Sequence, residues 1–161
     1  MISRDRGVAE RIAFHQNCVG AVPGPWDAYL TMRGAKTLSL RMRAHVRNAQ
    51  AIAEFLAARE DVHAVHYPGL PGHPQHELAK RQMSGFGGIV AFRPAGGAER
   101  ARAIATSTAI FDLAVSLGGV ESLICSPAAM THGSLSPQER AELGITDDLL
   151  RLSVGIEETD D

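Results

Sequence analysis

The segment from Ser39 to Arg59 constrains the fold of this chain more than any other segment does. Its apolar residues recur at alternating steps of four and three, which places them on one face of an α-helix roughly 30 Å long. These residues are Met42, Val46, Ala49, Ala53 and Leu56. A long helix with one apolar face predicts a fold in which helices pack as a layer against another element.

Shorter elements alternate after this helix. Runs rich in β-branched and apolar residues predict strands at 62–67, 88–92, 113–117, 122–125 and 149–154. Helices are predicted at 75–83, at 98–109 and from Ser136 onward, with another short helix that begins near Trp26 and is interrupted at Gly34. The alternation predicts an α/β fold with a small sheet covered by helices, and periodicity leaves the strand order open.

Composition fits one domain with a real core. The chain has 161 residues, 45% hydrophobic and 21% charged, and a formal net charge of −2. This balance argues against an electrostatic grip on nucleic acid or on an anionic membrane. No apolar run has the length of a signal peptide or of a membrane helix, and Cys18 and Cys125 form no paired motif. A cytoplasmic location is therefore expected.

Four histidines form a paired pattern that superficially resembles a zinc site. They are His63, His66, His73 and His76. An offset of three along a strand sends His63 and His66 to opposite faces, so the two rings do not easily reach one ion. Surface or loop-capping histidines are the preferred interpretation, and no metal site is predicted.

Two residue types carry possible chemistry. Arg151 lies in an alternating strand pattern on the face opposite Leu150 and Leu152, where it is either a solvated cation or a clamp for a carboxylate. Lys36 and Lys80 are the only lysines, so any covalent lysine chemistry of this chain requires one of them. Neither lysine has the apolar sequence surroundings that would activate an amine.

Several long motifs in the same order strongly resemble the pyridoxal-phosphate enzymes of cysteine and methionine metabolism, the cystathionine γ-synthase, γ-lyase and β-lyase family with methionine γ-lyase. The resemblance covers nearly the whole chain. The motifs lie at 16–38, 41–49, 67–70, 83–88, 116–123, 127–132 and 151–157, and include Ser116-Leu117-Gly118-Gly119-Val120-Glu121-Ser122-Leu123 and Arg151-Leu152-Ser153-Val154-Gly155-Ile156-Glu157.

The resemblance implies a fold-type I, aspartate aminotransferase-like architecture, of which this chain would be the C-terminal portion. Residues 1–38 would be the end of the large domain and a linker. Residues 39–161 would be the small C-terminal α/β domain, with a short, mostly antiparallel sheet covered by helices and preceded by the long linking helix 39–59. The resemblance also implies a homo-oligomer, and the apolar face of that helix would need cover without the large domain.

The resemblance also implies roles for individual residues. Arg151 matches the arginine that binds the α-carboxylate of the substrate, Ser116 matches a serine that lines the substrate region, and Thr131 matches a supporting position. Glu121 also matches a supporting position. Val115 stands where some relatives have glutamate, so a precise substrate preference does not transfer.

The implied cofactor is pyridoxal 5′-phosphate, which the family holds on a lysine in a Ser-x-Thr-Lys motif that this sequence lacks. No catalytic or cofactor-binding residue is therefore assigned here. The expected function is that of the C-terminal part of an enzyme that forms or cleaves C–S bonds of sulfur amino acids, inactive alone and partnered by the missing N-terminal domain or by further copies. The alternative is a non-catalytic interaction module or remnant that pairs with full-length subunits.

Overall fold

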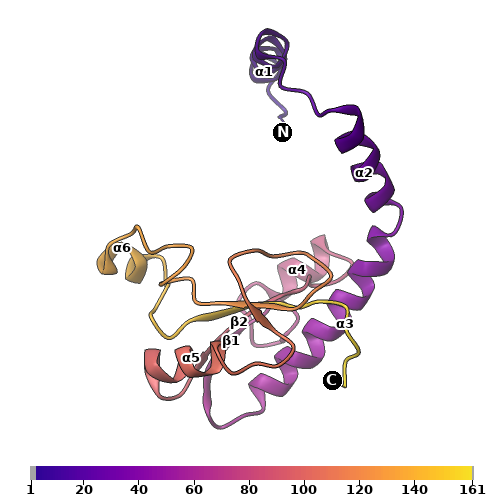
Figure 1. Cartoon of the computed structure of the whole chain (residues 1–161). Coiled ribbons are helices and arrows are strands. Elements are labelled where there is room, and N and C mark those ends of the chain that lie inside the picture. Colours follow the sequence, from indigo (N-terminus) through magenta and orange to yellow (C-terminus); the bar gives the residue numbers. More distant parts are fainter. Residues whose placement is uncertain (1–2, 161) are drawn as a thin grey trace. The chain divides into compact units, whose positions relative to one another are not determined.

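The structure is a computed structural model that describes residues 3–160. The chain divides into two compact units, Met1–Leu38 and Ser39–Asp161. The first unit contains the helices α1 (Arg6–Val19) and α2 (Pro25–Ala35), and the second contains every strand (Figure 1). None of the described helices is both long and apolar enough to cross a membrane.

Local capping defines the helix that periodicity did not predict. The Asp5 side chain accepts a hydrogen bond of 2.9 Å from the Val8 amide at the start of α1, and Gly20, with φ +67°, ends it in the left-handed region. Neither α1 nor α2 buries a residue. The predicted interruption near Gly34 is confirmed to within one residue, because α2 ends at Ala35 and a turn at 36–37 follows it.

The long helix is confirmed as α3 (Leu38–Ala57). Ala49, Ala53 and Leu56 are buried among residues of the sheet. The expectation that this apolar face would need an outside partner is therefore wrong for these residues, because the sheet of the same chain covers them. Met42, near the start of the helix, is 38% exposed.

A five-stranded sheet forms the centre of the second unit, in the order β1-β2-β5-β4-β3. All neighbouring pairs are antiparallel except β3 and β4, which are parallel, so the mostly antiparallel sheet is confirmed. The strands are β1 (Val62–His66), β2 (Ile89–Pro94), β3 (Asp112–Leu113), β4 (Leu123–Cys125) and β5 (Leu150–Ser153).

The strand predicted at 113–117 is wrong beyond its first residue. The Ala114 amide still donates to the carbonyl of Ile124, at 3.0 Å, but the chain then leaves the ladder. The residues that follow bond to side chains on β5, so their backbone groups do not extend the sheet.

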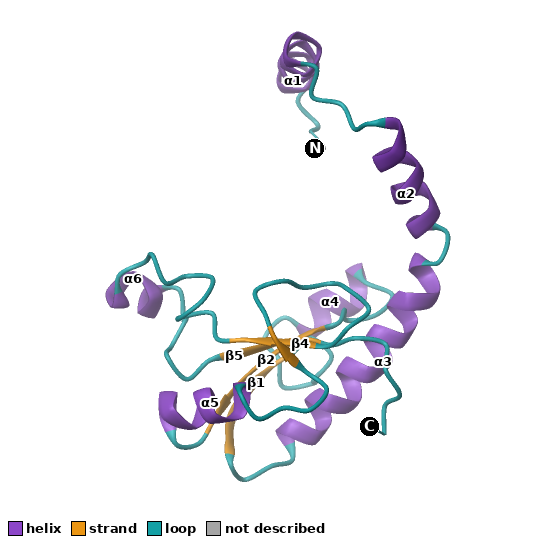
Figure 2. Cartoon of the chain, in the orientation of Figure 1, coloured by secondary structure: helices purple, strands orange, loops and turns teal. Residues whose placement is uncertain are grey.

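Helices cover one face of the sheet. Val90 and Phe92 on β2, with Leu150 and Leu152 on β5, bury their side chains against α3 and α5 (Gly97–Ala105). Figure 2 shows these two helices on the same side of the strands. The remaining helices are α4 (His76–Gln82) and α6 (Pro137–Glu142), and α6 begins with the reciprocal bonds of Ser136 and Glu139 that form a capping box.

Candidate functional site

Arg151 lies on the sheet face opposite the helices. Strand alternation buries Leu150 and Leu152 in the core and turns Arg151 to the other side, where its register partners are Ala91 on β2 and Cys125 on β4. Burial raises the pKa of the Cys125 thiol, and the nearby positive charge of Arg151 partly offsets this shift. The guanidinium is therefore presented from the centre of a rigid sheet.

The backbone of residues 115 and 116 accepts hydrogen bonds from this guanidinium. Nη2 of Arg151 donates to the carbonyl oxygens of Val115 and Ser116, at 3.1 and 3.2 Å. The Gly118 amide donates to Oγ of Ser153 at 2.9 Å. The structure thus brings Arg151 and Ser116 together through the backbone of Ser116, while the side chain of Ser116 is exposed.

The guanidinium retains donors that the protein does not use. Nε of Arg151 is buried and has no hydrogen-bond partner among residues 3–160. A buried donor without a partner is costly, and such groups in native proteins often belong to a site where another molecule binds. The arginine is half-buried, so its planar fork is held in place.

Thr131 lies apart from this contact. Its hydroxyl is 2.8 Å from Nδ1 of His132 and donates to the carbonyl of Pro127 at 3.4 Å. These bonds close the turn that follows β4. The side-chain hydrogen bonds of Thr131 in the described chain join it to neither Arg151 nor Ser116.

A buried polar network supports the chain just after Arg151. Both carboxylate oxygens of Glu157 accept from Ser122, one from its amide at 2.8 Å and the other from its hydroxyl at 2.9 Å. The Ser122 hydroxyl in turn accepts from the Gly155 amide at 2.9 Å. Burial raises the pKa of Glu157, but its own backbone amide and the Ser122 bonds outweigh this, so the net pKa is lowered.

The helix α3 contributes two side chains to the same support. Asn48 donates to the carbonyls of Gly155, at 3.2 Å, and Glu157, at 2.8 Å. His45 places Nδ1 at 2.6 Å from the carbonyl of Val154. Sequence reasoning gave no role to His45 or Asn48, although both lie within the motif at 41–49. Their signal was the presence of polar residues on the buried face of an amphipathic helix.

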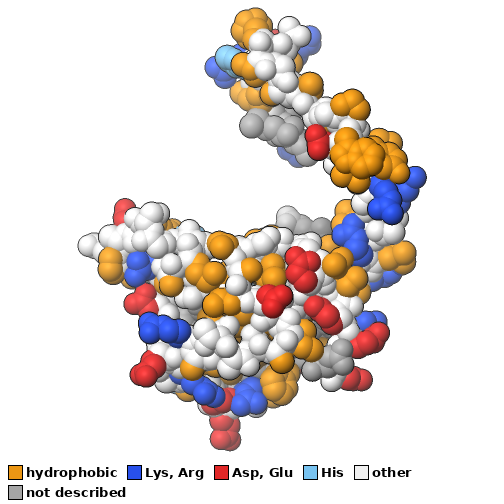
Figure 3. All heavy atoms as spheres, in the orientation of Figure 1, with side chains coloured by type: hydrophobic (Ala, Val, Ile, Leu, Met, Phe, Trp, Pro, Cys, Tyr) orange, Lys and Arg blue, Asp and Glu red, His pale blue; other side chains and the backbone are white. Residues whose placement is uncertain are grey.

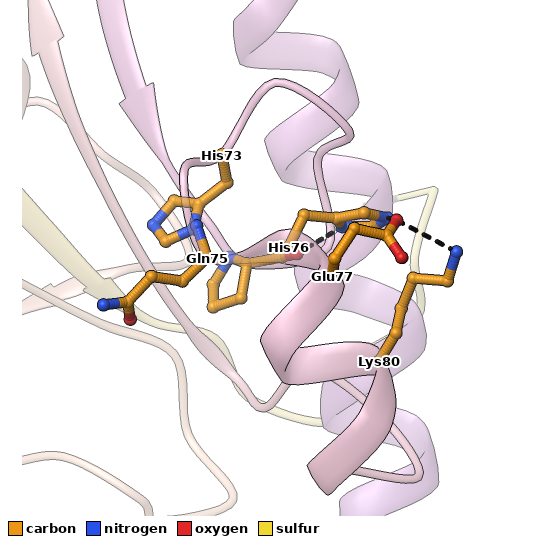
Figure 4. A network of polar contacts seen from close by, with 6 residues as sticks. His73, Gln75, His76, Glu77 and Lys80 are labelled. Atoms are coloured by element: carbon orange, nitrogen blue, oxygen red, sulfur yellow. Dashed lines mark hydrogen bonds and ion pairs between the residues drawn. The ribbon is translucent and has the colours of Figure 1, made fainter.

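The two lysines do not fit the anchoring of pyridoxal phosphate. Nζ of Lys80 donates to Glu77 at 3.2 Å on the exposed side of α4, as Figure 4 shows. Lys36 is exposed at the end of α2. An amine that forms a Schiff base needs an environment that favours its neutral form, and an exposed amine with a carboxylate partner lacks one. Neither lysine therefore suits the aldehyde end of this cofactor.

The histidines serve structural contacts. Nδ1 of His76 is 2.7 Å from the carbonyl of Pro68, and its ring stacks on Phe86 with centroids 5.4 Å apart. Nδ1 of His73 accepts from the Gln75 amide at 3.2 Å (Figure 4). His63 and His66 are exposed on β1. Within residues 3–160, no group of three His, Cys, Asp or Glu side chains is arranged to hold a metal ion.

Two cavities lie elsewhere in the second unit. One, of about 320 Å³, is lined by residues of α3, of the stretch 108–111 and of the C-terminal stretch 157–159. The other, of about 420 Å³, lies among α5, the turn at 126–130 and Arg140. Neither cavity is lined by Arg151, Ser116 or Thr131, so the carboxylate-binding candidate is a surface site of this chain.

Comparisons with known proteins agree with these motifs. The profile of the family described as "Cys/Met metabolism PLP-dependent enzyme" matches residues 1–161. The cystathionine γ-synthase of Mycobacterium tuberculosis is 55% identical over 161 residues, which are 100% of this chain and 41% of that protein. The cystathionine γ-lyase of Dictyostelium discoideum is 54% identical over 151 residues, 94% of this chain and 39% of that protein.

A solved structure gives the same result. The cystathionine γ-synthase of Xanthomonas oryzae pv. oryzae, in complex with aminoacrylate and cysteine, superposes with a TM-score of 0.91 at 46% identity. The match covers 99% of this chain and 41% of that one. This chain spans about two fifths of the length of these relatives, and it belongs to the pyridoxal-phosphate-dependent enzymes of cysteine and methionine metabolism.

Proposed function

We propose that this chain supplies the substrate-carboxylate half of a pyridoxal-phosphate-dependent enzyme that forms or cleaves C–S bonds of sulfur amino acids. The relatives are cystathionine γ-synthases and γ-lyases, and one solved relative is in complex with cystathionine. The chain is inactive alone, because its two lysines lie in exposed surroundings that suit no Schiff base.

The observation that carries this proposal is the setting of Arg151. A guanidinium on a central strand, held by two backbone carbonyls and with unused donors, is suited to bind a carboxylate. Its role is to bind and orient the α-carboxylate of the amino acid. Ser116 lies beside the guanidinium, because its backbone carbonyl accepts a hydrogen bond from Arg151. Thr131 supports the turn after β4.

A chimera tests the proposal. Residues 1–161 replace the matching segment of the Mycobacterium tuberculosis cystathionine γ-synthase, which is 55% identical over this range. We expect the chimera to turn over, and Arg151→Lys to raise KM for the amino-acid substrate by about 10- to 100-fold with a smaller change in kcat, because a lysine lacks the planar fork.

Arg81→Ala is the matched control, because Arg81 lies exposed on α4. It should leave both kinetic constants unchanged. An active chimera in which Arg151→Ala keeps the original KM would refute the carboxylate role. A folded chimera that never turns over would support the non-catalytic module instead.

A further inference from the structure

Side chains of β5 tie down the segment 115–118. The last ladder bond before it is the one from the Ala114 amide to Ile124, and the next backbone bond after it runs from the Ile156 amide to the carbonyl of Val120, at 2.9 Å. Between these points, two side chains of β5 bond to the segment. Arg151 donates to the carbonyls of Val115 and Ser116, and Ser153 accepts from the Gly118 amide. The two β5 residues therefore hold the two ends of one short segment.

The Ser153 bond acts at a turn. Gly118 has φ +80°, a left-handed conformation that favours glycine, and its amide points to Oγ of Ser153. Ser153 is 2% exposed and follows Arg151 by two residues, so both side chains leave the same face of β5. The hydroxyl is thus a fixed acceptor beside the arginine.

We propose that Ser153 is a positioning residue for the Arg151 guanidinium. By holding the Gly118 amide, its hydroxyl fixes the segment that presents the carbonyls of Val115 and Ser116 to Nη2. With Nη2 held by the two carbonyls, the plane of the guanidinium is set. The functional meaning of this role rests on the proposed function, because orientation matters only if the guanidinium binds a ligand.

The Ser153 hydroxyl and the Arg151 guanidinium should therefore be coupled, although no hydrogen bond joins them directly. Without the Ser153 hydroxyl, the Gly118 amide loses its acceptor and the segment is held at one end only. The carbonyls of 115 and 116 then shift relative to Nη2, and the guanidinium rotates more freely. A hydroxyl that served stability alone would leave the Arg151 signals unchanged.

NMR spectroscopy of the 161-residue chain tests this coupling. In the parent chain, hindered rotation should give separate Nη1 and Nη2 signals for Arg151. Ser153→Ala should average these signals and speed hydrogen exchange of the Gly118 amide by about tenfold, as expected for the loss of one hydrogen bond. Ser107→Ala is the matched control, because its exposed hydroxyl donates only locally to the carbonyl of Ile104.

Two further variants complete the test. Ser153→Thr keeps the hydroxyl, so the Arg151 signals and the exchange of the Gly118 amide should be those of the parent chain. Ser153→Cys has a side chain of similar size whose sulfur is a weak acceptor, so it should resemble Ser153→Ala. Unchanged Arg151 signals in a folded Ser153→Ala or Ser153→Cys chain would overturn the inference, whether or not Gly118 exchanges faster.

The outcome is separable from that of the proposed function. The Arg151 and Gly118 signals report positioning in the absence of any substrate. The KM change of Arg151→Lys in the chimera reports carboxylate binding. If Ser153→Ala changes the Arg151 signals but Arg151→Lys leaves KM unchanged, only the proposed function is rejected. If Arg151→Lys raises KM but Ser153→Ala leaves the Arg151 signals unchanged, only the positioning role is rejected.

Discussion

Nδ1 of His45 lies 2.6 Å from the carbonyl oxygen of Val154, and both residues are buried. This bond joins the long helix α3 to the chain that leaves β5. It lies three residues after Arg151, so the helix fixes the end of the strand that presents the guanidinium.

His45→Ala should therefore destabilise the second unit. The substitution leaves the Val154 carbonyl without its side-chain donor in a buried place, and we expect the free energy of unfolding to fall by about 1 to 3 kcal/mol. Urea denaturation followed by circular dichroism measures it. His63→Ala, at an exposed position of β1, is the control and should change stability by less than about 0.5 kcal/mol. Equal effects of both variants would contradict the structural role of His45.

Gly155→Ala should be destabilising for a steric reason. An added Cβ would collide with the carbonyl oxygen of Val120 and with the carboxylate of Glu157, which is held by Ser122. Forcing such a contact costs about 1 to 3 kcal/mol, measured as the loss of unfolding free energy.

Gly72→Ala is the matched control for this steric effect. Gly72 is exposed, and an added Cβ there would meet nothing within 4 Å. We expect it to be neutral or slightly stabilising. A Gly155→Ala chain as stable as the Gly72→Ala chain would show that the turn after β5 is loosely packed.

The stability of the second unit should fall in acid. Burial raises the pKa of Asp148, but hydrogen bonds and charge from Arg93, at 3.0 to 3.1 Å, outweigh it and leave a net lowered pKa. The folded state then binds this proton more weakly than the unfolded state does. The contribution is present above the unfolded pKa of about 3.9 and is lost as the pH falls through the folded value.

Urea midpoints measured from pH 7 to pH 2 check this prediction. The parent chain should lose stability below about pH 4, where the unfolded carboxyl begins to bind its proton. Asp148→Asn should be less stable at pH 7 and should show a shallower decline in acid. A decline as steep as that of the parent chain would assign the acid sensitivity to other carboxylates.

Pyridoxal phosphate added to the isolated chain should form no specific aldimine. Lys80 is paired with Glu77 on an exposed face, which is not the apolar setting that a Schiff-base lysine needs. Equimolar cofactor should give no yellow aldimine absorbance, and borohydride reduction should leave no adduct at Lys36 or Lys80 in a peptide map. A saturable adduct that Lys80→Ala or Lys36→Ala removes would contradict the assignment of inactivity to the chain alone.

The elements with clear periodic patterns were predicted well from the sequence, and those held by side chains were not. The helix α3 and the strands β1, β2, β4 and β5 have apolar residues at the spacing that their burial requires. The helix α1 has no buried face, and the carbonyls of residues 115 and 116 bond to Arg151 instead of to a neighbouring strand. Periodicity detects neither case, because it reports burial alone.

The candidate site divides in the same way. Strand alternation placed Arg151 on the face opposite Leu150 and Leu152, and the structure agrees. Its contact with the backbone of Ser116, across 35 positions of sequence, follows from the fold. So does the support from His45 and Asn48, whose partners lie more than 100 positions away.

The amino-acid sequence by itself determined the layered α/β class, the long helix, the family and the sheet face on which Arg151 lies. Those conclusions depend on the spacing of residues and on motifs, which are present in the order of amino acids along the chain. The tertiary structure alone decided the strand order, the cover of the long helix by its own sheet and the fixing of Arg151 through Ser153 and Gly118. These depend on hydrogen bonds and packing between distant residues, and such pairings exist only once the chain has folded.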